Sequence, residues 1–250
     1  MRFGRTWSLL AVGTLAACSV GPSAGDNVNL DLAAAAAENA AQNIEVMRGP
    51  GGIHGFGLRF DPSSFDCESR SHEGLTVTMT CTYKDAAGNT QAAYDALTTA
   101  SAAVHASVSG SFDRGHMSGS VDRQSDLSVT GLAGVETRMT WNGAETGTMT
   151  HGHPASGDEE ARQYQMTFTA TTTNVVIPVP RTPTSWPLSG STTSQVTITF
   201  TGGDKDGTTE QRNVTVTFDG TQYASVTVNG ETFTVDLAKR GRPERGHRKP

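Results

Sequence analysis

The sequence predicts a mainly β protein: one large twisted antiparallel meander, half-barrel or sandwich-like, with one N-terminal α-helix packed on it. Apolar residues alternate with threonine over most of the chain after residue 52, as in strands with one buried face. Only 35% of the residues are hydrophobic and 6% aromatic, and Thr, Ser and Gly are abundant, which favours strands and turns. Asp-Gly and Asn-Gly pairs separate alternating runs near the C-terminus and indicate hairpins. A closed barrel is an alternative arrangement of the same strands.

The chain begins with features of an export signal. Arg2 and Arg5 precede an apolar run of eleven residues, Trp7–Ala17, which leads directly to Cys18. A positive start, a short apolar region and a small-residue end are typical of a secretory signal peptide. A membrane-spanning helix needs roughly 20 apolar residues, so this run is too short for one.

The residues Leu15-Ala16-Ala17-Cys18 resemble the lipobox of bacterial lipoprotein signal peptides. The resemblance is confined to this leader, and no family is recognised for the folded body. It implies that residues 1–17 are removed and that Cys18 carries lipid, which would hold the protein at a membrane of the cell envelope. Ser19 after the cysteine goes with outer-membrane sorting in such lipoproteins, facing the periplasm or the surface. An ordinary signal peptide cut elsewhere is the alternative.

Behind Cys18, residues 18–30 are polar and contain Gly and Pro, which predicts a flexible tether. Residues 31–238 are expected to form a single mainly β domain, since all-β domains of this length are often single. Its one helix is predicted at Asp31–Met47, an alanine-rich stretch that ends before Gly49-Pro50. The apolar stripe expected to lie on the sheet comprises Leu32, Ala36, Ala40, Ile44 and Met47.

Strands are expected wherever the period of two persists. The alternating stretches are Leu75–Tyr83, a strand that ends at Phe112, three weaker ones around Val121–Leu132, Val135–Trp141 and Glu145–His151, and Tyr164–Ile177. Asn142-Gly143 separates two of the weaker strands and is interpreted as a turn. Residues 90–101 predict a loop or a short helix, and the proline-rich Val179–Pro187 predicts a connection. A four-stranded meander is predicted at 195–238, with turns at Asp219-Gly220 and Asn229-Gly230.

Cys67 and Cys81 remain as an even pair once Cys18 is assigned to the lipid. Disulfides persist in exported proteins, and the two cysteines flank a predicted turn near Ser71–Gly74. A disulfide across that hairpin is therefore expected. The alternative, a metal site, needs more ligands than two cysteines supply.

The clearest candidate for metal binding is His151-Gly-His153, and it is a weak one because zinc requires three or four ligands. Exposed loop histidines are the alternative interpretation. Asp204–Gly207 begins like a calcium loop, but Thr215 stands where the motif requires Glu, so a hairpin loop is expected there. The sequence thus predicts no catalytic residue, no metal and no cofactor.

Five methionines fall within the predicted strands: Met79, Met117, Met139, Met149 and Met166. Flexible thioethers fill irregular cores, and they also line adaptable surfaces for apolar ligands. Both interpretations are consistent with an aromatic-poor sheet.

The charge of the chain is unevenly distributed. Residues 19–238 hold 11 Lys and Arg against 24 Asp and Glu, a net −13, whereas residues 239–250 carry +5. The acidic body argues against general nucleic-acid binding, which needs clustered cations. The basic tail is expected to be disordered, and either contacts anionic lipid headgroups or is a solvated appendage.

Together these features predict a lipid-anchored protein of the cell envelope with a non-catalytic structural or binding role. Its membrane contact would be the lipid on Cys18, and the sequence names no protein partner. The alternative is a periplasmic carrier or chaperone that binds a hydrophobic ligand in a curved sheet. That plan is similar to lipoprotein-sorting carriers only in combining a helix with a half-barrel. A hydrolase with dispersed carboxylates is a third possibility.

Overall fold

In the computed structural model, the described residues are 28–29, 32–33, 35–36, 40, 67, 70–72, 74–113, 118–134, 136–153, 162–179, 185–202 and 205–239. The strands are β1 (Arg70–His72), β2 (Leu75–Asp85), β3 (Thr90–Gln91), β4 (Thr99–Asp113), β5 (Ser118–Thr130), β6 (Arg138–His153), β7 (Arg162–Pro178), β8 (Ser189–Thr201), β9 (Thr209–Thr217), β10 (Tyr223–Val228) and β11 (Glu231–Asp236). The short 3₁₀ helix η3 (Leu237–Lys239) follows β11.

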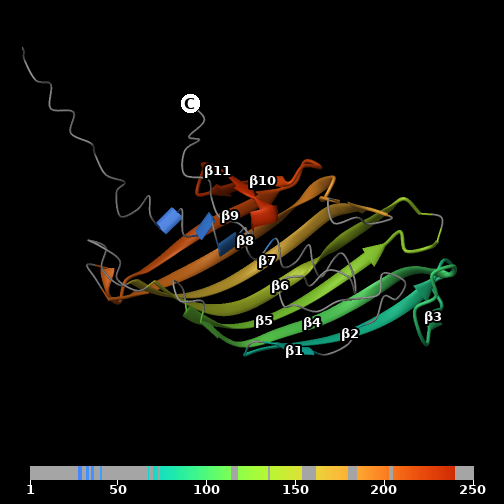
Figure 1. Cartoon of the computed structure of the whole chain (residues 1–250), viewed down its shortest axis with the longest axis horizontal. Coiled ribbons are helices and arrows are strands. Elements are labelled where there is room, and N and C mark those ends of the chain that lie inside the picture. Colours follow the sequence, from blue (N-terminus) through green and yellow to red (C-terminus); the bar gives the residue numbers. More distant parts are fainter. Residues whose placement is uncertain are drawn as a thin grey trace, which may run out of the picture.

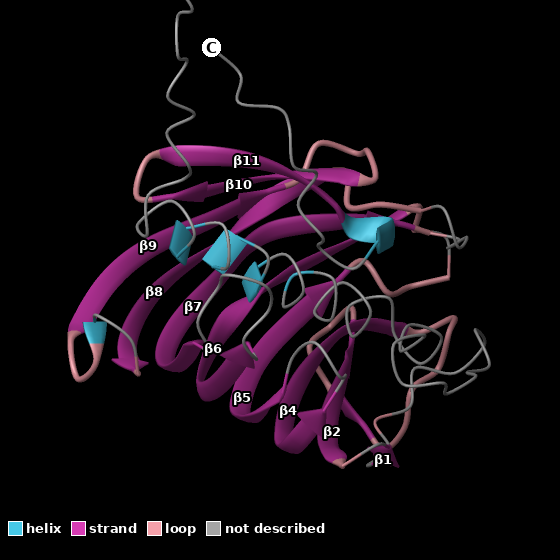
Figure 2. Ribbon diagram, turned by 60° about the vertical axis from the view of Figure 1, so that its left-hand side comes forward, coloured by secondary structure: helices cyan, strands magenta, loops and turns pink. Residues whose placement is uncertain are grey.

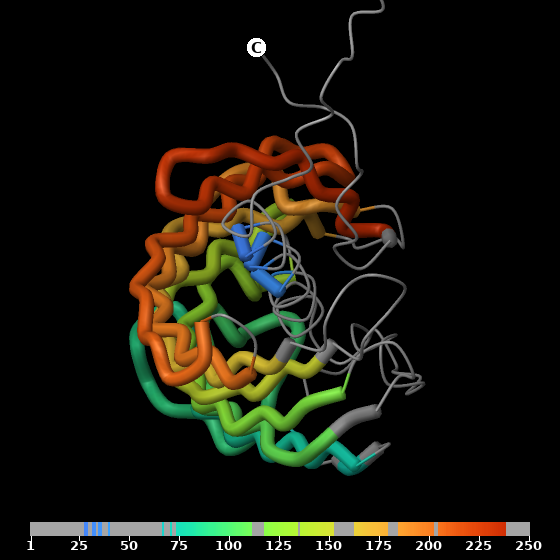
Figure 3. The backbone as a smooth tube through the Cα atoms, turned by 90° about the vertical axis from the view of Figure 1, so that its left-hand side faces the viewer, coloured from blue at the N-terminus to red at the C-terminus, as the bar shows by residue number. Residues whose placement is uncertain are grey.

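All these strands belong to one antiparallel sheet in the order β1-β2-β4-β5-β6-β7-β8-β9-β10-β11, and β3 pairs with β2 beside this path. Apart from β3, neighbouring strands of the sheet are thus consecutive in the chain (Figure 1). The sheet curls strongly into an open trough with β1 and β11 at its two edges (Figures 2 and 3). The predicted mainly β antiparallel meander is confirmed, and the sheet is single and open rather than a closed barrel or a two-sheet sandwich.

The two faces of the sheet differ in chemistry. Along β10 the side chains of Ala224, Val226 and Val228 are buried, whereas Ser225 between them is exposed. The same alternation places Val, Ile, Phe, Met and Trp side chains on the concave face of the trough and mostly threonine on the convex face. Burial of about 25 cal/mol per Å² of apolar surface stabilises the concave side, and Trp141 at its centre is fully buried.

Seven described positions from the N-terminal segment have helical backbone and lie within the trough (Figure 3). Among them, Val28, Leu32, Ala33 and Ala40 are buried in the core of the sheet. The remainder of the helix predicted at 31–47 lies outside the described residues, so the helix as an element stays a prediction. Val28, inside the stretch 18–30 predicted as a tether, is buried in the core, and most of that stretch lies outside the described residues.

One predicted turn is instead a bulge inside the sheet. β6 runs without interruption through Asn142-Gly143, so the separate strands predicted on either side of this pair were wrong. The register shifts here between β6 and β7, and the amide oxygen of Asn142 accepts a 2.8 Å hydrogen bond from the backbone N–H of Asn174. Asn174 has a φ of +49°. The Asn-Gly dipeptide favours a positive φ, and this backbone conformation occurs in bulges as well as in hairpin turns.

The predicted C-terminal meander is confirmed as β8 to β11. Asn229 and Gly230, with φ of +47° and +91°, connect β10 to β11 as the two-residue turn that the dipeptide predicts. Asp219-Gly220 is different, because residues 218–222 form a five-residue connection from β9 to β10. Asp219 accepts hydrogen bonds from the backbone N–H and hydroxyl of Thr221, and these bonds lower the pKa of the Asp219 carboxyl.

The ambiguous residues 90–101 form the short strand β3, a turn at 96–98 and the start of β4. The Asp95 carboxylate accepts hydrogen bonds from the backbone N–H groups of Leu97 and Thr98, and the hydroxyl of buried Thr99 accepts one from the N–H of Asp95. The backbone carbonyl of Asp95 also accepts hydrogen bonds from the N–H groups of Thr98 and Thr99, so side-chain and backbone acceptors together build this turn.

Cys67 and Cys81 form the predicted disulfide, with Cα atoms 5.8 Å apart. The β1–β2 hairpin aligns them, since Arg70 lies opposite Val77 in its register. The bridge ties the segment before β1, at one open edge of the sheet, to the second strand.

Replacing both cysteines with serine is expected to lower the free energy of unfolding by about 3 kcal/mol, the entropy of a loop of this length. Urea denaturation of the variant and of the oxidised wild type measures the difference. Unchanged stability would show that the β1–β2 hairpin holds without the covalent link.

The predicted signal peptide, Cys18, Met117 and nearly all of the basic tail lie outside the described residues. Within the part of the chain that the structure describes, none of the helical segments has the length and apolar character needed to cross a membrane.

Candidate functional site

The concave face of the trough is the candidate functional surface. Its floor over β6 to β8 meets the N-terminal segment at a cavity of about 10 Å³, which has room for one water molecule at most. The cavity is lined by Val28, Leu32, Ala35, His151, Tyr164, Met166 and Ile198. The described part of the segment therefore packs closely on an apolar floor.

A buried ion pair interrupts this apolar floor. Arg123 on β5 and Glu145 on β6 have side chains only 6% and 5% exposed, and their Nη1 and Oε1 atoms are 3.8 Å apart. The Ser125 hydroxyl donates a 3.3 Å hydrogen bond to Glu145 Oε2. A positive charge, a negative charge and a hydroxyl group thus lie next to one another in the middle of the sheet.

The register explains how these three side chains come together. Ser125 lies directly opposite Glu145, and Arg123 lies opposite Gly147 two residues further along β6. All three positions have the parity of the buried residues Leu127 and Val129 on β5, so they face into the trough. Arg123 and Glu145 are therefore diagonal neighbours on the concave face.

Small residues surround this polar group. On the neighbouring strands, Ser125 faces Ala106 and Glu145 faces Ala170. A Cβ atom added at Gly147 would come within 2.9 Å of Phe168 Cζ and 3.1 Å of Arg123 Cα. The aromatic ring of Phe168 thus leans over Gly147 beside the arginine.

A buried charge pair is weak evidence for stability, because the cost of desolvation rivals the mutual attraction of the charges. Charged groups at such a position inside a concave surface are candidates for function. Neither residue of this pair was predicted from the sequence as part of a site. The sequence does hold a signal for the pair, because Arg123 and Glu145 occupy positions at which the alternation predicts apolar residues.

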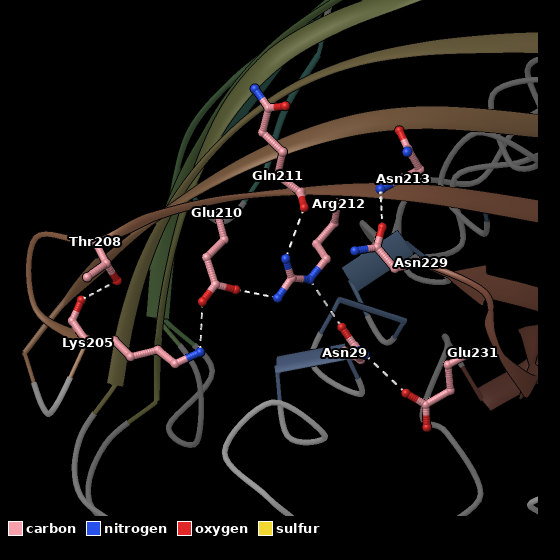
Figure 4. Close-up of polar contacts among 9 residues, drawn as sticks. All are labelled: Asn29, Lys205, Thr208, Glu210, Gln211, Arg212, Asn213, Asn229 and Glu231. Atoms are coloured by element: carbon pink, nitrogen blue, oxygen red, sulfur yellow. Dashed lines mark hydrogen bonds and ion pairs between the residues drawn. The ribbon is translucent and has the colours of Figure 1, made fainter.

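A second polar cluster holds the N-terminal segment to the C-terminal part of the sheet (Figure 4). The Asn29 side chain donates to Glu231 on β11 at 3.1 Å and accepts from Arg212 Nε on β9 at 3.3 Å. Arg212 also pairs with Glu210, to which Lys205 Nζ donates at 2.8 Å. We refer to Asn29, Lys205, Glu210, Arg212 and Glu231 as the latch cluster.

The hydrogen bond from Lys205 is the largest cause of a lowered pKa at Glu210, and the positive charge of Arg212 lowers it further. The pKa of Glu210 is lower in the folded state than in the unfolded state. The stability that the ionised Glu210 adds to the fold is therefore fully present above its ordinary pKa near 4.5, and it is lost as the pH falls through the lowered pKa.

The Glu210→Gln variant is therefore expected to be less stable than wild type at pH 7, by up to about 1 kcal/mol, with the difference vanishing in acid. Denaturant melts between pH 7 and 3 measure it. Lys205→Met is the control, because it should move the acid transition up towards the ordinary carboxyl pKa. A difference independent of pH would contradict the assignment to Glu210.

The two histidines predicted as a weak metal candidate are both on β6. His151 is half-buried at the cavity described above, and His153 pairs with Arg162 in the ladder. His105 is on the opposite, convex face, where its Nδ1 is 2.7 Å from Asp126 Oδ1. Over the described ranges, no group of three or more His, Cys, Asp or Glu side chains could hold a metal ion.

Four of the five methionines face the interior of the trough. Met139 and Met166 are buried, and Met79 and Met149 are half-buried against the core. Met149 and Met166 lie opposite one another on β6 and β7, and Met166 borders the cavity under the N-terminal segment. These thioethers give this part of the floor an adaptable shape.

No protein-family model, curated protein or solved structure matches this chain. The site is consequently defined by its own geometry: an apolar trough, a buried ion pair in its floor and a polar latch on the segment that lies within it.

Proposed function

We propose that the chain is a lipid-anchored protein of the cell envelope, without catalytic activity, that binds a hydrophobic ligand in its trough. The observation that carries the binding role is the apolar concave face of an open, curved sheet. The resemblance of Leu15–Cys18 to a lipobox supports the anchor, and outer-membrane localisation follows from the same resemblance. The proposal takes up the carrier interpretation of the sequence in preference to a purely structural role.

The described residues of the N-terminal segment, 28–29, 32–33, 35–36 and 40, would act as an exchangeable occupant of the trough. Its described buried residues include only two larger apolar side chains, Val28 and Leu32. Burying such a side chain contributes about 1.5–3 kcal/mol, and alanine contributes less. An acyl chain, with about 0.8 kcal/mol per buried CH₂, has enough apolar surface to replace this segment on the floor.

The latch cluster would determine how readily the segment leaves. Asn29 is its point of attachment on the segment, and its partners Arg212 and Glu231 are on β9 and β11. In sequence, the N-terminal segment follows Cys18. Breaking the hydrogen bonds of the latch cluster would therefore couple the anchored end of the chain to ligand entry into the trough.

The test is to purify the full chain without detergent and to identify extracted lipids by mass spectrometry. We expect a lipid-like molecule at close to one per chain. Met149→Gln changes a half-buried thioether of the floor into a polar group of similar length and is expected to reduce occupancy. Thr148→Gln changes the neighbouring exposed residue on the convex face and is the matched control. Empty wild-type protein, or equal occupancy in both variants, would refute the proposal.

A further inference from the structure

We propose that one end of the trough docks on the surface of an anionic lipid bilayer, into which Leu97, Leu188 and Tyr223 insert their side chains. This inference rests on the proposed function, because a carrier of lipid-like ligands has to meet a membrane to load or release them. It adds to the lipid anchor at Cys18 a second membrane contact, made by the folded body of the protein.

The meander brings the β2–β4, β5–β6, β7–β8 and β9–β10 connections to the same end of the sheet, because neighbouring strands are antiparallel. We refer to these four connections as the rim, and β3 marks part of it in Figure 1. Over the described residues, the large apolar side chains that are exposed are Leu97, Leu188 and Tyr223, at 82%, 36% and 41%. Leu97 lies between β3 and β4, Leu188 directly before β8, and Tyr223 at the first position of β10. All three are therefore at the rim.

These exposed side chains are on two opposite arms of the trough. Leu97 belongs to the side of β2 and β4, near one edge of the sheet, whereas Leu188 and Tyr223 belong to the side of β8 and β10, near the other edge. The curl of the sheet turns these two sides towards each other (Figure 3). A flat surface against the rim would therefore contact both arms at once, and the concave face would extend from that surface along the strands.

Hydrogen bonds fix the turns that carry the exposed side chains. Asp85, Asp95 and Asp219 each accept hydrogen bonds from backbone N–H groups two to four residues further along the chain. These bonds hold the carboxylates against their own turns, with Leu97 exposed directly after Asp95. Because the turns are already fixed, insertion costs little further conformational entropy.

Leucine and tyrosine have the chemistry that a bilayer surface accepts. A leucine side chain gains free energy when it leaves water, and tyrosine places its apolar ring among the acyl chains while its hydroxyl stays at the level of the headgroups. Three such side chains form a small apolar contact, which suits reversible docking.

The charge of the chain beyond the rim indicates which kind of bilayer is favoured. β11 ends at the rim, where Asp236 pairs with Tyr223, and η3 follows it up to Lys239. Residues 240–250, which continue the chain from this end, contain five Lys and Arg against one Glu. Cations next to a membrane surface are attracted to anionic headgroups, so the apolar and electrostatic contacts would be made with the same bilayer.

The first measurement is sedimentation of the full chain with vesicles of phosphatidylcholine and phosphatidylglycerol in equal amounts. Every protein carries Cys18→Ser, so that no lipid anchor contributes and the N-terminus is the same throughout. The rim variant Leu97→Ser/Leu188→Ser/Tyr223→Ser is expected to bind about tenfold to a hundredfold more weakly than its parent, because it loses the apolar contact. Vesicles of phosphatidylcholine alone are expected to bind the parent at least about tenfold more weakly than the anionic vesicles.

The matched control is Thr148→Ser/Thr167→Ser/Thr193→Ser, which changes three exposed residues of the convex face and is expected to bind as the parent does. Circular dichroism confirms that both triple variants are folded.

The second measurement tests insertion at a single position. In the Cys18→Ser chain, Cys67 and Cys81 are joined in the disulfide, so Leu97→Cys provides one free thiol for an environment-sensitive fluorophore. We expect its fluorescence to rise on anionic vesicles and to be quenched by lipids with brominated acyl chains. The same label at Thr148→Cys, on the convex face, is expected to show neither change.

The outcomes separate this inference from the proposed function. Equal vesicle binding by the rim variant and the control, or equal responses of the two labels, would overturn docking through the rim. Equal binding to both kinds of vesicle would overturn the preference for an anionic bilayer. Fluorescence of the Leu97 label that rises with protein concentration without vesicles would replace the bilayer with a second copy of the chain. In each of these cases, lipid extracted from detergent-free wild type would still support the proposed function, whereas empty wild type would refute that function and this inference with it.

Discussion

The single substitution Arg123→Met is expected to lower the free energy of unfolding by about 3–5 kcal/mol, because it removes the guanidinium that faces the buried Glu145 carboxylate. Glu145→Met should have a comparable effect, because it removes the carboxylate that faces the buried Arg123 guanidinium. The double variant Arg123→Met/Glu145→Met is expected to be as stable as wild type or more so, since apolar residues of similar volume often replace a buried pair without loss.

A double-mutant cycle in urea measures this coupling. The two single losses should greatly exceed the loss in the double variant, which gives a large interaction energy. Additive effects would contradict the account, because they would show that each residue makes its contribution through other contacts. A stable double variant would also show that the pair does not increase the stability of the sheet.

Gly190→Ala is expected to destabilise the protein by about 3 kcal/mol, through backbone strain and a steric clash. Gly190 is the second residue of β8 and has a φ of +102°. A Cβ atom added there would lie 2.3 Å from the backbone O of Asn174 and 2.5 Å from Val175 Cα. The backbone of β8 is also fixed from the other side, because Gly190 O accepts a 3.1 Å hydrogen bond from the N–H of Phe218.

The matched control is Gly88→Ala in the turn after β2. Gly88 has a similar φ of +87°, but no atom lies within 4 Å of its added Cβ, so only the conformational cost of about 1 kcal/mol applies. Thermal or urea melts of both variants separate strain from steric clash. Equal losses would show that β8 can move away from β7 at the point where the register of these two strands shifts, between Thr173 and Val176.

The sheet itself could be predicted because its signals are local. Alternation of apolar residues with threonine assigns each strand its two faces, and Asn229-Gly230 determines the last hairpin through its backbone conformation alone. Curvature could not be predicted in the same way. Asn142-Gly143 has the same composition as a turn, and only its pairing with Thr172 and Asn174 across the sheet makes it part of a bulge.

The candidate site was predictable only in part. The inward positions of Arg123 and Glu145 follow from the alternation within β5 and β6, but their proximity depends on the register that places Ser125 opposite Glu145. Asn29 is a further example, since its partners Arg212 and Glu231 are distant in sequence and approach it only when the sheet curls around the segment. Contacts of this kind are properties of the curved sheet as a whole rather than of any one stretch of sequence.

The central claim is that the concave face of the sheet is a ligand-binding surface, and photo-crosslinking tests it most directly. The probe is a myristoyl lysophosphatidylethanolamine with a diazirine at the end of its chain, and labelled peptides are mapped by mass spectrometry. We expect labelling of concave residues such as Met149, Met166 and Ile198, and we expect excess unlabelled lipid to suppress it. Labelling of convex residues such as Thr148 and Thr167, or labelling that competitor does not reduce, would contradict it.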